Sequence, residues 1–102
     1  MDRFPTPFAA VSLFAAAGVL LVGCGHPASR EECTLIFDKS AELELRQQRV
    51  TDPSVVGERV AAVRAARGEE LIGKCVGRRI TDRALACVKA SQTDDEMDRC
   101  LQ

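Results

Sequence analysis

Residues 29–49 read SREECTLIFDKSAELELRQQR, and this run predicts the first helix of the chain. Ser29 and Glu32 fit a capping box, in which each side chain can satisfy a backbone amide of the first helical turn. Apolar residues then recur at helical spacing and share one broad face. They are Cys33, Ile36, Phe37, Ala41 and Leu43, with Leu35 and Leu45 widening the face. We therefore expect helix from about Arg30 to Arg49.

A second helix is predicted after the turn at residues 50–53. Asp52 can cap a helix whose first residue is Pro53, because the missing proline amide costs nothing at that position. Gly68 and Gly73 should let this helix bend or loosen, and Gly77 should end it. Its apolar line consists of Val56, Val60, Val63, Leu71 and Cys75.

Two shorter helices are predicted near the carboxyl end. Thr81 can cap a helix over residues 82–90, and Thr93 with Glu96 forms a second capping box that opens a last short helix. This last helix carries Met97, Cys100 and Leu101 on one side. Because no segment alternates with a period of two residues, we expect an all-α fold, a small bundle of three to four helices.

The amino terminus has the layout of an export signal. Residues 1–3 are followed by an uncharged apolar stretch from Phe4 to Val22, and the apolar middle from Phe8 to Val22 is 15 residues long. A membrane-spanning helix needs roughly 20 residues. The segment is therefore predicted to be a signal peptide rather than a permanent anchor.

Leu21, Val22, Gly23 and Cys24 close this segment and resemble the bacterial lipobox. The resemblance implies cleavage between Gly23 and Cys24, a diacylglycerol on the Cys24 thiol, and an acyl chain such as palmitate on the freed amine. Gly25 after the cysteine implies the periplasmic face of the outer membrane. The expected domains are a signal peptide at 1–23, a short tether at 24–28 and a helical domain at 29–102. An uncleaved membrane helix and ordinary secretory cleavage are the alternatives.

Four further cysteines, Cys33, Cys75, Cys87 and Cys100, predict two disulfides. Removing 23 of the 102 residues leaves 79, near the lower limit for a domain without cross-links. We favour Cys33–Cys87 with Cys75–Cys100 because these pairs close larger loops, and the sequential pairing stays open. A helical hairpin would place Cys33 and Cys75 at one end, which should face the membrane. The gaps of 41, 11 and 12 residues do not suit a zinc site, so neither a metal nor a cofactor is expected.

The capped helices, the cysteine spacing and the Cys-Val-x-Ala pattern at residues 87–90 resemble uncharacterised four-cysteine helical lipoproteins of Gram-negative envelopes. That resemblance implies no known activity. His26, the only histidine, is interpreted as a solvated tether residue, which leaves Ser-His-Asp or Cys-His catalysis without a base.

Charge offers one candidate contact surface. The net charge of −1 does not favour nucleic-acid binding. A local basic group could contact lipid phosphates, and the alternative is a solvated helix end whose charges complement the helix dipole. Its members are Lys74, Arg78, Arg79 and Arg83.

The expected function is therefore that of a lipid-anchored, non-enzymatic envelope protein that binds a partner protein or the membrane surface. The alternatives are an accessory or inhibitory subunit of an envelope complex, and a small thiol-redox protein.

Overall fold

The computed structural model describes residues 25–102 and confirms a helical bundle with two disulfides. The expected signal peptide and Cys24 lie outside the described residues. In chain order the elements are β1 (His26–Pro27), α1 (Arg30–Gln47), α2 (Pro53–Val63), the π-helical segment η3 (Arg64–Gly68), α3 (Glu69–Cys75), β2 (Arg79–Ile80), α4 (Asp82–Ala90) and α5 (Asp94–Cys100).

Local capping explains where the first two helices begin. The Ser29 hydroxyl accepts the Glu32 amide and the Glu32 carboxylate accepts the Ser29 amide, so the predicted capping box is present. Helix α1 ends at Gln47, two residues earlier than expected, and Arg49 adopts a left-handed conformation with φ of 67°. Asp52 then caps α2 by accepting the amides of Ser54 and Val55.

The second predicted helix continues through a π-helical segment, which confirms the loosening expected near Gly68. Gly68 is buried, and a Cβ atom there would lie 2.8 Å from the Cγ atom of Arg64. The Arg64 guanidinium is held by both carboxylate oxygens of Asp38, with Nε–Oδ1 at 2.9 Å and Nη2–Oδ2 at 2.7 Å. Gly73 instead lies in regular helix, and the chain turns at Gly77, where φ is +89°.

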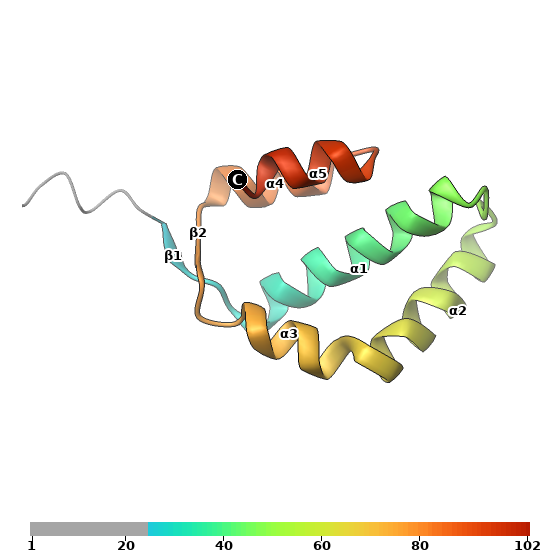
Figure 1. Ribbon diagram of the computed structural model, residues 1–102, viewed down its shortest axis with the longest axis horizontal. Coiled ribbons are helices and arrows are strands. Elements are labelled where there is room, and N and C mark those ends of the chain that lie inside the picture. Colours follow the sequence, from blue (N-terminus) through green and yellow to red (C-terminus); the bar gives the residue numbers. More distant parts are fainter. Residues whose placement is uncertain (1–24) are drawn as a thin grey trace, which may run out of the picture.

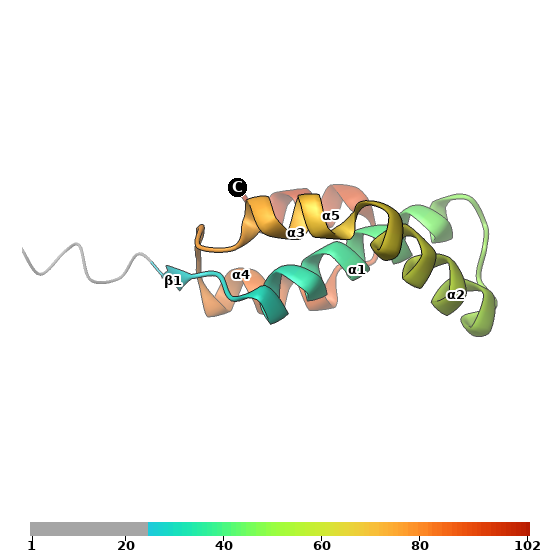
Figure 2. The same cartoon turned by 90° about the horizontal axis from the view of Figure 1, so that it is seen from below.

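Helix α1 lies in the middle of the bundle. Figure 1 shows α2 and α3 along one side of α1 and the hairpin of α4 and α5 along the other. Figure 2 shows the turn between α1 and α2 at the end opposite β1. One core cluster near β1 contains Ala28, Cys33, Ile72, Ile80 and Leu85. A second cluster, where α1 packs on α4 and α5, contains Leu43, Val88 and Met97.

The carboxyl-terminal hairpin follows the predicted caps with one difference. Thr81 accepts the amide of Ala84, and Thr93 accepts the amide of Glu96. The Glu96 carboxylate, however, accepts the amide of Gln92 rather than that of Thr93. The predicted second capping box is therefore not formed, and the Thr93 hydroxyl caps the start of α5 without the reciprocal bond.

The favoured disulfide pairing is wrong. Cys33 bonds to Cys75 with a Cα–Cα distance of 5.9 Å, and Cys87 bonds to Cys100 with a Cα–Cα distance of 5.6 Å. The antiparallel packing of α3 on α1 brings the first two cysteines together, and the α4–α5 hairpin brings the second two together. Proximity across neighbouring helices decides the pairing, whereas the size of the closed loop does not.

The expected tether at residues 24–28 is also corrected over its described part, residues 25–28. His26–Pro27 pairs antiparallel with Arg79–Ile80, in the register His26 opposite Ile80 and Pro27 opposite Arg79. The Ala28 amide donates to the Arg78 carbonyl at 2.7 Å, and the Gly77 amide donates to the Ala28 carbonyl at 2.9 Å. The folded domain therefore includes Gly25 to Ala28, because this short segment satisfies its backbone groups against the chain around β2.

Candidate functional site

The two-stranded ribbon of β1 and β2 lies at the end of the bundle where the described chain begins (Figure 1). Gly25 precedes it with a φ of +82°, and a Cβ atom there would lie 2.4 Å from the Ile80 carbonyl oxygen. The Arg79 Nη1 atom donates to the Gly25 carbonyl at 2.9 Å. A side chain at residue 25 would therefore force the two strands apart.

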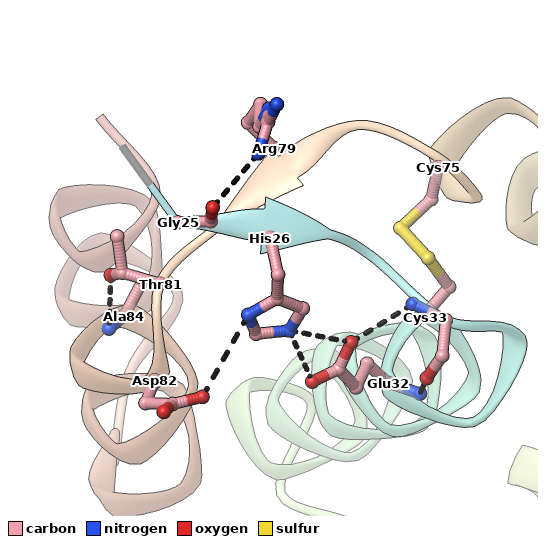
Figure 3. A network of polar contacts seen from close by, with 10 residues as sticks. Gly25, His26, Glu32, Cys33, Cys75, Arg79, Thr81, Asp82 and Ala84 are labelled. Atoms are coloured by element: carbon pink, nitrogen blue, oxygen red, sulfur yellow. Dashed lines mark hydrogen bonds and ion pairs between the residues drawn. A yellow bond between two sulfur atoms is a disulfide. The ribbon is translucent and has the colours of Figure 1, made fainter. Parts of the chain in front are cut away.

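His26 joins the ribbon to two helices instead of lying in a solvated tether. Figure 3 shows its imidazole directed toward Glu32 of α1 and Asp82 of α4. Its Nε2 atom lies 2.8 and 3.0 Å from the two Glu32 carboxylate oxygens, and its Nδ1 atom lies 3.9 Å from the Asp82 Oδ1 atom. The hydrogen bond from the Ser29 backbone lowers the pKa of Glu32 most, and the bond with His26 lowers it further. The carboxylate thus connects the ribbon to the start of α1.

The four predicted basic residues are all exposed, but the structure gives them different partners. The Lys74 Nζ atom is 3.1 Å from the Glu70 carboxylate, so its charge is partly offset. Arg79 donates to Gly25, a carbonyl rather than a carboxylate. Within residues 25–102, Arg78 and Arg83 form no ion pair. Positive charge without an acidic partner among the described residues therefore remains around β2 and the start of α4.

A groove next to the ribbon brings two of these arginines to an apolar surface. We call it the ribbon groove; its volume is about 630 Å³, and it is lined by residues of α1, the ends of α3 and α5, β2 and the start of α4. Its lining includes Arg78, Arg79, Ile36, Ile80, Ala84 and Leu101. Neither Lys74 nor Arg83 lines it. Sequence reasoning identified the arginines but missed the apolar lining, because these residues come from four separate segments.

A second groove of similar size lies between α1 and α2 near the opposite end. Its lining includes Val56, Val60 and two arginines that already have acidic partners. Arg46 pairs with Glu42 at 3.0 Å, and Arg64 pairs with Asp38 at 2.7 Å. This α1–α2 groove therefore offers little uncompensated charge to a ligand, in contrast to the ribbon groove.

The described residues offer little for a thiol site, a metal site or a membrane-spanning helix. Cys33, Cys75, Cys87 and Cys100 are all held in disulfides. Residues 25–102 contain no group of three or more His, Cys, Asp or Glu side chains placed to bind one metal ion. No helix in this range has the length and apolar character needed to cross a membrane.

Comparison with known proteins gives no match to a family model, a curated protein or a solved structure.

Proposed function

We propose that this protein is a lipid-anchored cell-envelope protein that acts as a non-enzymatic binding module at the membrane surface. In this proposal the signal is cleaved after Gly23, and Cys24 carries the lipid, on the periplasmic face of the outer membrane. The lipobox resemblance at residues 21–24 supports this cleavage, lipidation and location.

The observation that carries the proposal is the tight attachment of Gly25 to the ribbon. One peptide bond separates Cys24 from Gly25, and consecutive Cα atoms are only about 3.8 Å apart. Gly25 contacts the backbone of Ile80 and accepts a hydrogen bond from Arg79. A lipid on Cys24 would therefore hold the ribbon end of the bundle against the membrane, with no flexible spacer between them.

Charge at the ribbon end supports the same orientation. Arg78 and Arg83 are exposed there, and neither has an acidic partner among the described residues. Basic side chains near an anionic lipid surface are attracted to it, so they would add to the hold of the acyl chains. The turn between α1 and α2 would then point away from the membrane and present the α1–α2 hairpin to a partner.

The first test is the intact mass of the protein extracted from membranes, followed by peptide mapping of its amino terminus. We expect a chain that starts at Cys24 and carries acyl mass, and a Cys24→Ala variant that lacks it. Alkylation before and after reduction should reveal four thiols only after reduction. A chain that retains Met1 and carries no acyl mass would contradict the proposal.

A further inference from the structure

We propose that the ribbon groove binds one acyl chain of an anionic phospholipid, with the lipid phosphate held by Arg78 and Arg79. The proposed function brings the groove to a bilayer, and the inference adds a specific lipid site to that anchoring role.

The lining of the groove suits an apolar chain. Ile36 and Ala84 are half-buried, and Leu101 remains 44% exposed beside them. When a hydrocarbon chain covers exposed apolar side chains and removes them from water, the free energy of the complex falls.

The rim of the groove suits a phosphate. Arg78 has no acidic partner in the described chain, and Arg79 uses Nη1 on the neutral Gly25 carbonyl. Guanidinium groups bind phosphate through paired, charge-assisted hydrogen bonds. The α1–α2 groove lacks this property because its arginines, Arg46 and Arg64, are already paired with carboxylates.

An occupant must therefore combine an apolar chain with an anionic head, as a phospholipid does. Position favours a lipid over a soluble amphiphile. Gly25 packs on Ile80 and Thr81, and both of these residues line the groove. A lipid attached to the preceding residue, Cys24, would keep the mouth of the groove at the bilayer surface.

The test is photolabelling of the full-length protein in non-ionic detergent micelles that contain a small fraction of phosphatidylglycerol with a diazirine in one acyl chain. Detergent micelles give the lipid access to the groove whether or not Cys24 is acylated. Peptide mapping should place the adducts on groove residues such as Ile80, Ala84 and Leu101. Phosphatidylcholine with the same diazirine should label these residues less, because its head group carries no net charge.

The variant Arg78→Gln with Arg79→Gln should lower labelling of the groove about tenfold, since loss of a hydrogen bond to a charged group typically weakens binding by about that factor. The matched control, Arg46→Gln with Arg64→Gln in the α1–α2 groove, should leave groove labelling unchanged. Circular dichroism of each variant checks that the helices remain. Adducts elsewhere, equal labelling by both lipids, or no effect of the Arg78 and Arg79 changes would overturn the inference.

The intact mass of the same samples separates the two proposals. Acylated protein without groove labelling rejects the lipid site and keeps the anchor. Groove labelling of protein without acyl mass rejects the anchor and keeps the lipid site.

Discussion

Removal of the Cys33–Cys75 disulfide should destabilise the protein more than removal of the Cys87–Cys100 disulfide. The two bonds join residues separated by 42 and 13 positions. In the chain-entropy model these separations correspond to about 3.9 and about 2.9 kcal/mol at 25 °C. Cys33 is also only 2% exposed, whereas Cys87 is exposed, so replacement of the first pair removes packing as well. We therefore expect the losses in the free energy of unfolding to differ by at least about 1 kcal/mol between the two variants.

The assay is urea unfolding of the variants Cys33→Ala with Cys75→Ala and Cys87→Ala with Cys100→Ala, followed by circular dichroism without reductant. Each variant keeps the other disulfide, so the comparison isolates one cross-link at a time. The dependence of the unfolding free energy on urea should be checked, because loss of a cross-link can expand the unfolded chain. Equal destabilisation, or a larger loss for the second variant, would refute the reasoning from loop size and burial.

Three further predictions concern single positions. Gly25→Ala should lower the urea midpoint more than Gly77→Ala, because both have positive φ but only Gly25 faces a backbone oxygen at 2.4 Å; equal losses would deny the close approach. Gly73→Ala should raise the urea midpoint and add about 0.5–1 kcal/mol to the free energy of unfolding, since Gly73 lies in a helix and a Cβ atom there would meet no neighbour within 4 Å; a lower midpoint would contradict this. The pKa of Glu32 lies below its usual 4.5, so the ionised carboxylate stabilises the folded protein above that pH, and this stability is lost as the pH falls through the lowered pKa. Glu32→Gln should therefore make the urea midpoint depend less on pH on the acid side.

The helix starts could be predicted from the sequence because capping is a local interaction. Ser29, Asp52, Thr81 and Thr93 each cap the helix expected from them. Each side chain reaches an amide two or three residues away, so the signal lies within one helical turn. The end of α1 is not marked in the sequence, because the residue in the left-handed turn is Arg49 and not a glycine.

The position of the cysteines was predicted better than their pairing. The expected hairpin correctly places Cys33 and Cys75 at the same end, yet the preference for larger loops favoured other partners. A disulfide forms between cysteines whose Cα atoms are close in the folded chain, here 5.9 Å apart, and loop size affects only how much the bond stabilises.

The helical class, the caps and the even number of cysteines in the helical domain can be read from the sequence, since these depend on spacing along the chain. The ribbon, the contacts of His26 and the ribbon groove emerge only when the chain has folded. His26 pairs with Ile80 across the whole hairpin of α1 to α3, and the groove joins residues from Ala28 to Gln102. No local pattern encodes such contacts, because they exist only after the helices have packed and brought distant segments together.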